Sequence, residues 1–325
     1  MSVSQQKRVV VTGMGINTPL GDTLDKFYQG LISGTSAITQ WKFLQNPAVY
    51  SKVGGDLSEY DDAAKIKALE GKLPPALHKR LRQLCKKAPF STKISALVSA
   101  DAWIDAGLVG LEDKLDPTRR ATLVGGHNLN ERYFASNYET FLHEEPDYID
   151  SMAALHMLDT DHAGSVCEML GWQGAAYTLG GACASANVAL RSALDEIRHH
   201  DHDIAMVVGP VLDFSQMGVH AMALLGAITY ESYNDSPARA SRPYDTKREG
   251  FVPSHGAGVL VLEELGHALR RGARIYAEVL GCTSTSDGCH LPSPSMDGQA
   301  RTLERLLRRC GVRPDEVDFI CAHAT

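Results

Sequence analysis

The sequence predicts an α/β protein in which strands and helices alternate along the chain. Short apolar runs at 8–15, 121–126 and 203–209 have the length of buried strands, and each of them contains or ends in glycine. The segment 91–106 instead repeats its apolar residues at helical spacing. Because strands and helices alternate, we expect largely parallel sheets with helices on both faces.

The expected elements follow one another in a simple order. A strand over 8–15 precedes a helix over 24–32, for which Asp22 is the expected cap. Residues 40–90, with mixed charge and scattered Pro and Gly, form an excursion from the core. Apart from the strand and the helix that flank Cys183, the other elements are a helix over 91–106, a strand over 121–126, helical pieces within 128–174, strands over 203–209, 256–263 and 275–281, helices over 266–271 and 299–310, and a last strand over 317–325.

The glycines of the first strand raise the possibility of a nucleotide site. Gly13 and Gly15, followed by Thr18 and Pro19, match only the opening of a dinucleotide-binding fingerprint. No acidic residue ends a second strand about 20 residues later, as that fingerprint requires. We therefore expect a strand that ends in a glycine turn and no nucleotide there.

Composition excludes several classes of protein. The formal net charge of −7 argues against a nucleic-acid binder, which would carry an excess of Lys and Arg. The seven cysteines are odd in number and irregularly spaced, so no disulfide framework is expected. Residues 1–7 lack a hydrophobic signal core, and no apolar run reaches the roughly 18 residues of a membrane span. We expect a cytoplasmic protein that enters no membrane.

Cys183 is the most informative residue. An apolar strand runs into the small residues Gly180, Gly181 and Ala182, and an uninterrupted helix-forming segment follows from 184 to 199. This pattern predicts a strand-turn-helix elbow with a thiol at its corner. The unpaired N–H groups of a helix N-terminus stabilise a nearby negative charge, which suits a nucleophilic thiolate. A free cysteine is more often a buried structural residue, but the elbow favours a nucleophile here.

Several blocks match one known family in the same order. They are 9–15 (VVVTGMG), 19–21 (PLG), the Cys183 elbow, 241–245 (SRPYD), 249–252 (EGFV), 255–264 (HGAGVLVLEE), 268–278 (ALRRGARIYAE) and 322–325 (AHAT). The chain resembles an elongating β-ketoacyl-[acyl-carrier-protein] synthase of type II fatty-acid and polyketide synthesis. The resemblance extends over essentially all 325 residues.

The resemblance implies a thiolase-like fold of two similar α/β halves, each a sheet between helices. We expect an N-terminal half over 1–265 and the start of a C-terminal half over 266–325, with the second half incomplete in this chain. We therefore expect the chain to be one piece of a longer polypeptide. Such synthases pair through the strand before the nucleophile, here about 175–180, as a homodimer or with a synthase-like subunit.

The resemblance also assigns roles to three residues. Cys183 accepts the acyl chain as a thioester, and His323 is the first of two histidines that stabilise the enolate left by decarboxylation. Thr325 begins the hydroxyl pair that holds the pantetheine arm. The second histidine, a lysine and a gating loop are expected beyond residue 325. Gly181 and Ala324 depart from the family, which usually has Thr or Ser and Gly there, and indicate a divergent member of secondary metabolism.

The function implied is decarboxylative Claisen condensation of an acyl group on Cys183 with malonyl-acyl carrier protein (ACP). The substrates are acyl and malonyl thioesters carried on phosphopantetheine of ACP, and no other cofactor is implied. The expected pathway is polyketide or specialised fatty-acid synthesis. Two alternatives are a ketosynthase-like malonyl-ACP decarboxylase and a non-catalytic partner subunit of the chain-length-factor type. Cys183 argues against both, because such relatives generally lack the cysteine.

Other candidate sites are weaker. Lys86 and Lys87, in a basic run, fall near the region that receives the carrier protein in relatives, although a solvated helix face is an equal interpretation. Cys282, Cys289 and His290 fit no known zinc spacing, so no metal is expected. A papain-like protease is disfavoured because the reactive cysteine and histidine both end predicted core strands, and thiolase itself because its nucleophile comes much earlier.

Overall fold

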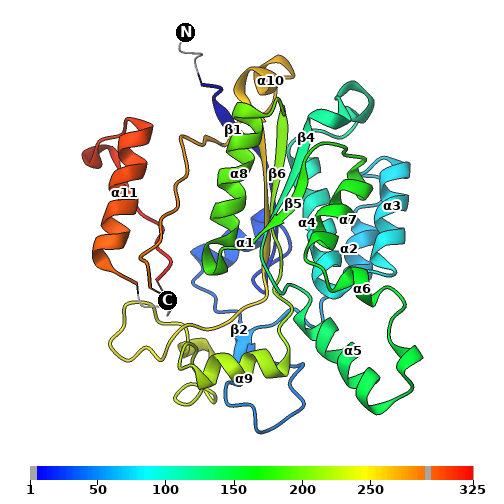
Figure 1. Cartoon of the computed structure of the whole chain (residues 1–325), viewed down its shortest axis with the longest axis vertical. Helices are drawn as coiled ribbons and strands as arrows, with labels where there is room; N and C mark the ends of the chain where they lie inside the picture. Colours follow the sequence, from blue (N-terminus) through cyan, green and yellow to red (C-terminus); the bar gives the residue numbers. More distant parts are fainter. Residues whose placement is uncertain (1–5, 290–293, 325) are drawn as a thin grey trace.

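A computed structural model describes residues 6–289 and 294–324 of the chain (Figure 1). Its strands are β1 (Val9–Asn17), β2 (Ile38–Gln40), β3 (Val53–Gly55), β4 (Arg120–Gly125), β5 (Ala176–Leu179), β6 (Ile204–Gly209), β7 (Ala257–Glu264) and β8 (Ala277–Glu278). Its helices are α1 (Leu24–Ile32), α2 (Asp62–Ala68), α3 (Pro75–Cys85), α4 (Phe90–Asp105), α5 (Glu131–His143), α6 (Ala153–His156), α7 (Thr160–Leu170), α8 (Ser185–His199), α9 (Gln216–Leu224), α10 (Leu265–Arg270) and α11 (Met296–Cys310). The α/β class is confirmed.

One six-stranded sheet in the order β5-β4-β6-β7-β1-β8 organises the molecule, and β2 pairs with β3 separately. The strand β4 is parallel to β5 and β6, as predicted. The prediction of a largely parallel sheet is wrong beyond β6, because β7 is antiparallel to β6 and to β1, and β8 is antiparallel to β1. The helix α8 carries the chain back across the sheet between β5 and β6. The segment 210–256 does not carry the chain back across the sheet. Strand β7 therefore begins at the same end of the sheet where β6 finishes, and it runs antiparallel to β6.

Helices cover both faces of this sheet (Figure 1). The apolar side of α8 packs through Ala189, Ala193 and Ile197 on one face. On the other face α4 and α7 form the larger core, with α3 packed against them. Every residue of β4 is buried, as expected for a strand with a helix layer on either side.

Gly13 and Gly15 serve helix packing. Both lie inside β1, so the expected turn at this point is wrong. A Cβ on Gly15 would stand 2.3 Å from the Val98 carbonyl oxygen, and one on Gly13 would stand 2.7 Å from the Ala102 carbonyl oxygen. The absence of side chains therefore lets α4 lie directly on β1.

The first helix has the predicted bounds but a different cap. The Thr23 hydroxyl accepts a hydrogen bond from the Lys26 N–H at 3.2 Å. The Asp22 carboxylate instead pairs with the Lys26 ammonium at 2.8 Å and accepts from the Tyr60 hydroxyl. A hydroxyl directly before the first helical residue is well placed to satisfy an N–H group of the first turn.

The predicted last strand over 317–325 is not formed within the described residues 317–324. Its apolar side chains Phe319 and Ile320 are 83% and 66% exposed. A strand is stabilised by ladder hydrogen bonds, and none of the described strands pairs with this segment. The expected strand over 275–281 is likewise reduced to β8, which pairs with β1 only at Val10 and Val11.

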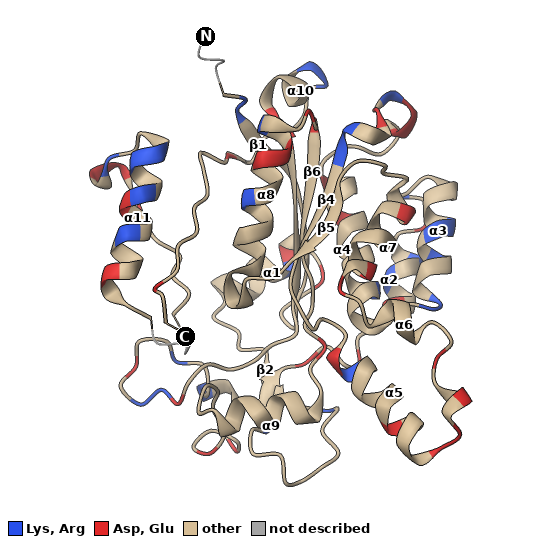
Figure 2. Ribbon diagram, viewed as in Figure 1, with Lys and Arg blue, Asp and Glu red and all other residues tan. Residues whose placement is uncertain are grey.

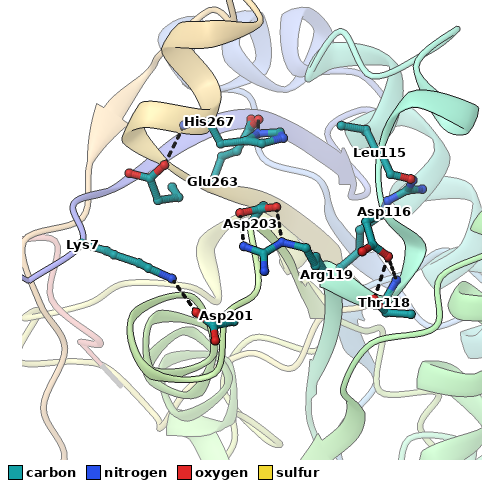
Figure 3. A network of polar contacts seen from close by, with 11 residues as sticks. Lys7, Leu115, Asp116, Thr118, Arg119, Asp201, Asp203, Glu263 and His267 are labelled. Atoms are coloured by element: carbon teal, nitrogen blue, oxygen red, sulfur yellow. Dashed lines mark hydrogen bonds and ion pairs between the residues drawn. The ribbon is translucent and has the colours of Figure 1, made fainter.

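Ion pairs join the strands where β4 and β6 begin (Figure 3). The Arg119 guanidinium donates two hydrogen bonds to the Asp203 carboxylate, at 2.6 and 2.8 Å. This bidentate pair precedes both strands and holds them in register. Nearby, Lys7 pairs with Asp201 at 3.4 Å on the surface. The network lies at the opposite end of the parallel strands from Cys183, which follows the end of β5.

His162 makes stability depend on pH. Its ring is fully buried on α7, and its Nδ1 is 3.0 Å from the Ser95 hydroxyl. Burial, with repulsion from His156, lowers its pKa from 6.5 to about 3. As the pH falls from about 6.5 towards 3, only the unfolded chain takes up a proton at this residue. The free energy of unfolding should therefore fall by about 1.4 kcal/mol per pH unit in that range.

Urea unfolding at pH 7 and pH 5 measures this effect. His162→Gln should lose this part of the pH dependence. His143→Gln is the matched control, because the His143 side chain is 72% exposed and its removal should leave the dependence intact. Equal pH dependence in the His162→Gln variant and the unaltered protein would contradict the assignment.

Candidate active site

The predicted elbow around Cys183 is present. Strand β5 ends at Leu179, a short 3-10 turn spans Ala182–Ala184, and α8 begins at Ser185. The Cys183 thiol is exposed at the corner. Ala182, directly before it, has a φ of +49°, in the left-handed region that residues other than glycine rarely adopt.

The Ser185 hydroxyl holds this corner. It accepts a hydrogen bond from the Gly181 N–H at 2.9 Å and donates one to the Ala182 carbonyl at 2.7 Å. Ser185 is 5% exposed, so both bonds are protected from water. The two bonds tie the residues before Cys183 to the first residue of α8 and offset the strain at Ala182.

Gly125 brings the elbow against the sheet. It is the last residue of β4, and a Cβ there would stand 2.6 Å from the Ser185 carbonyl oxygen and 2.8 Å from the Ala186 Cα. Both are backbone atoms at the start of α8. The start of α8 can lie this close to β4 only because position 125 has no side chain.

Cys183 and His323 line the same cavity, although they lie far apart in the sequence. The cavity has a volume of about 440 Å³. Its walls are the elbow, a loop over 241–252 and the segment 322–324. The lining residues are Cys183, Ser241, Arg242, Pro243, Arg248, Gly250, Phe251, Val252, Ala322, His323 and Ala324. Thr325, the third residue assigned by the resemblance, lies outside the described residues.

Ala324, which follows His323, has a φ of +47°. This is a conformation that favours glycine, so the departure from the family's usual Gly adds a Cβ where the backbone is already strained. Cys183 and His323 are therefore each adjacent to an alanine in the left-handed region. Strained backbone of this kind clusters at functional sites.

The loop over 241–252 was not assigned to the site from the sequence. Its signal was present, because two of the blocks that carried the resemblance fall within it. Glu249 anchors it by accepting hydrogen bonds from the Thr229 hydroxyl at 2.8 Å and the N–H groups of Tyr230 and Glu231 at 3.1 Å each. Burial would raise the pKa of Glu249, but these hydrogen bonds outweigh it and lower the pKa. The anchored carboxylate keeps this wall of the cavity in place.

The structure does not bring Lys86 and Lys87 to Cys183. Both are exposed at the end of α3, across the sheet from the elbow (Figures 1 and 2). Lys86 lines a separate groove of about 610 Å³ between α2 and α3. A third cavity, of about 880 Å³, is also separate and lies between the loop after β2, α5 and α9. The cavity of about 440 Å³ is the better candidate because Cys183 and His323 line it and neither of them lines the other two.

Across residues 6–289 and 294–324, His, Cys, Asp and Glu form no group of three that could hold a metal ion. Cys282 donates to the Asn187 carbonyl at 3.3 Å, and Cys289 is exposed. His290, the other member of that sequence cluster, lies outside the described residues. In the same part of the chain, the helices are too short or too polar to cross a lipid bilayer.

Two family profiles match the chain in succession. The profile described as the β-ketoacyl synthase N-terminal domain matches residues 6–268, and that described as the C-terminal domain matches residues 276–325. The chain belongs to the β-ketoacyl synthase family. Cys183 lies in the first matched range and His323 in the second.

Individual relatives agree with the family. The chain is 31% identical over 317 residues to the polyketide biosynthesis malonyl-ACP decarboxylase PksF of Bacillus subtilis strain 168, covering 98% of this chain and 72% of that protein. It is 31% identical over 327 residues to the chloroplastic 3-oxoacyl-[acyl-carrier-protein] synthase II of Arabidopsis thaliana, covering 99% and 57%. The chain thus spans little more than half of the second relative.

A solved structure confirms the fold. The ishigamide ketosynthase/chain length factor superposes with a TM-score of 0.84 at 27% identity, covering 99% of this chain and 74% of that one. The thiolase-like ketosynthase fold expected from the resemblance is therefore present in this chain.

Proposed function

We propose that this chain carries the acyl-accepting site of a β-ketoacyl-ACP synthase, with Cys183 as nucleophile and His323 as a donor to the substrate oxygen. The observation that carries the proposal is the cavity shared by Cys183 and His323. The elbow supports it, because Ser185 and Gly125 hold an exposed thiol at the end of a strand and the start of a helix. Thr325 is proposed to contact the pantetheine arm.

The reaction proceeds in two stages. The Cys183 thiol gives up its proton, the thiolate attacks the carbonyl carbon of an acyl-ACP, and a new thioester forms. The carrier is released as a thiolate and takes up the proton that Cys183 lost. Malonyl-ACP then loses carbon dioxide, and the enolate carbon attacks the Cys183 thioester, which releases the cysteine and a β-ketoacyl-ACP. The His323 imidazole N–H stabilises the negative charge on the malonyl thioester oxygen. Dividing the transfer through a covalent intermediate lowers each barrier.

The reaction needs no metal or organic cofactor beyond the phosphopantetheine of the carrier. Its product is a polyketide or specialised fatty-acid intermediate, which the similarity to a polyketide biosynthesis protein supports. All seven cysteines are free, which supports a reducing cytoplasm. The matched ranges 6–268 and 276–325 support two halves that divide near residue 265.

Two partners are proposed. ACP docks on a basic surface, and the exposed Lys86 and Lys87 remain candidates, since cations attract an acidic carrier. A second synthase subunit, identical or similar, pairs along β5. This strand is at the edge of the sheet, and an unpaired edge can accept another strand.

A second candidate function is malonyl-ACP decarboxylation without condensation. The similarity to PksF of Bacillus subtilis favours it. Cys183 favours condensation, because a decarboxylase needs no acyl acceptor. A chain-length-factor-type role is supported only by the name of one structural relative and leaves the exposed thiol without a use.

Mass spectrometry of the complete protein tests the proposal. Incubation with acyl-ACP should add one acyl group to Cys183, and malonyl-ACP should then yield β-ketoacyl-ACP. Cys183→Ala should lose the adduct and lower condensation by about a thousandfold or more. Cys289→Ala, which removes an exposed thiol outside the cavity, should retain both. Acetyl-ACP formation with an unmodified Cys183 would assign the decarboxylase instead.

A further inference from the structure

The cavity that holds Cys183 carries positive charge. Arg242 and Arg248 both line it, and none of the described residues of its lining is acidic. A cavity wall with two guanidinium groups and no carboxylate attracts anions and repels none.

The two arginines differ in how their charge is balanced. Arg242 pairs with the Asp245 carboxylate at 2.8 Å and lies over the Tyr233 ring, 5.2 Å from its centroid. Arg248 is exposed and donates to the Asp245 backbone carbonyl at 3.0 Å. Within residues 6–289 and 294–324 no carboxylate lies in ion-pair distance of Arg248, so its charge is available to a ligand.

The loop presents Arg248 in a defined position. Glu249, the next residue, is anchored by the hydrogen bonds from 229–232. Gly250 has a φ of +75°, and a Cβ there would stand 2.3 Å from the Ala227 carbonyl oxygen, so the backbone packs closely after Arg248. Before it, the Asp245 carboxylate accepts from the Lys247 N–H at 2.7 Å. Because the backbone is fixed on both sides of Arg248, less conformational entropy is lost when a ligand binds to it.

We propose that Arg248 binds an anionic group of the incoming thioester and so makes the Cys183 cavity selective for anionic substrates. This inference rests on the proposed function. Two groups of such a substrate have the required chemistry: the free carboxylate of a malonyl unit and the phosphate of the pantetheine arm. The planar guanidinium fork of arginine binds either group through paired hydrogen bonds.

Four unreactive substrate analogues distinguish the two sources. Each is a pantetheine analogue with nitrogen in place of the thioester sulfur, bearing an acetyl or a malonyl unit, with or without the 4′-phosphate. The affinity of each is measured by how strongly it protects Cys183 of the complete protein from alkylation by iodoacetamide. Protection requires only binding, so this readout does not depend on condensation.

Arg248→Gln should weaken the analogues that bear the recognised anion by about 10- to 100-fold. It should leave the neutral acetyl analogue without phosphate within about twofold of the unaltered protein. A loss confined to both malonyl analogues identifies the carboxylate, and a loss confined to both phosphorylated analogues identifies the phosphate. Arg248→Lys should restore part of the loss, because it keeps the charge without the planar fork.

Arg239→Gln is the matched control, since Arg239 is exposed nearby and does not line the cavity. It should change none of the four affinities. An equal loss for all four analogues with Arg248→Gln, or no loss for any, would overturn the inference. If Cys183 accepts an acyl group in that case, the proposed function stands and only the role of Arg248 is wrong.

Discussion

Replacing Glu263 by alanine is expected to lower the free energy of unfolding by about 3 kcal/mol or more. The Glu263 carboxylate is fully buried at the end of β7 (Figure 3). It accepts hydrogen bonds from Arg271 at 2.6 and 2.7 Å, and His267 Nδ1 is 2.5 Å from it. Removing the carboxylate leaves these largely buried groups without their acceptor. The free energy of unfolding falls because a buried charge is then left without its partner.

Urea unfolding at pH 7 measures this effect. Glu263→Gln keeps the shape and one acceptor, so it should lose less stability than Glu263→Ala. Asp315→Ala is the control, because Asp315 pairs with Arg313 on the surface and such pairs contribute about 0–1 kcal/mol. An effect of Glu263→Ala no larger than that of the control would contradict the role assigned to the buried carboxylate.

The pH dependence of the same variants has a defined sign. Burial alone would raise the pKa of Glu263, but the hydrogen bonds from Arg271 and His267 outweigh it and lower the pKa. The stabilisation is therefore present above the ordinary carboxylate pKa and is lost as the pH falls towards the lower value of the folded state. Unaltered protein and Glu263→Gln should converge in stability under acidic conditions.

Gly125→Ala is expected to cost about 1–3 kcal/mol of stability and also to slow acylation of Cys183. The added Cβ would meet the Ser185 carbonyl at 2.6 Å, so the start of α8 must move. This movement disturbs the hydrogen bonds of the Ser185 hydroxyl to Gly181 and Ala182, which shape the corner before the thiol. Urea unfolding measures the change in stability. The rate at which iodoacetamide alkylates Cys183 measures the change in the accessibility and reaction of the thiol.

Gly164→Ala provides the comparison. Gly164 lies within α7, and a Cβ there would meet no atom within 4 Å. This substitution should leave the alkylation rate unchanged and raise stability by about 0.5–1 kcal/mol, because alanine is the better helix former. If Gly125→Ala behaves like Gly164→Ala, the close approach of α8 to β4 does not position Cys183.

Local pattern was enough to predict much of the fold. Apolar periodicity located α1, α4 and α8 to within a residue or two, because each helix has one continuous signal along the chain. The elbow at Cys183 could be predicted for the same reason, since a strand, small residues and a helix are contiguous there. The cap of α1 was wrong because Asp22 and Thr23 both satisfy the same local rule.

The predictions that failed depend on contacts between distant segments. The direction of β7 follows from the path of 210–256, which no local pattern records. The segment 317–324 has the apolar composition of a strand, yet none of the described strands pairs with it. The glycines of β1 look like a turn in sequence and prove to be the contact surface for α4.

Sequence alone determined that this is an α/β chain with a cysteine at a strand-helix corner, because those properties arise from neighbouring residues. The tertiary structure decided that Cys183 shares a cavity with His323 and that Arg248 lines it. These residues come from three separate segments of the chain. Only the packing of the sheet, the elbow and the 241–252 loop determines the distances between them.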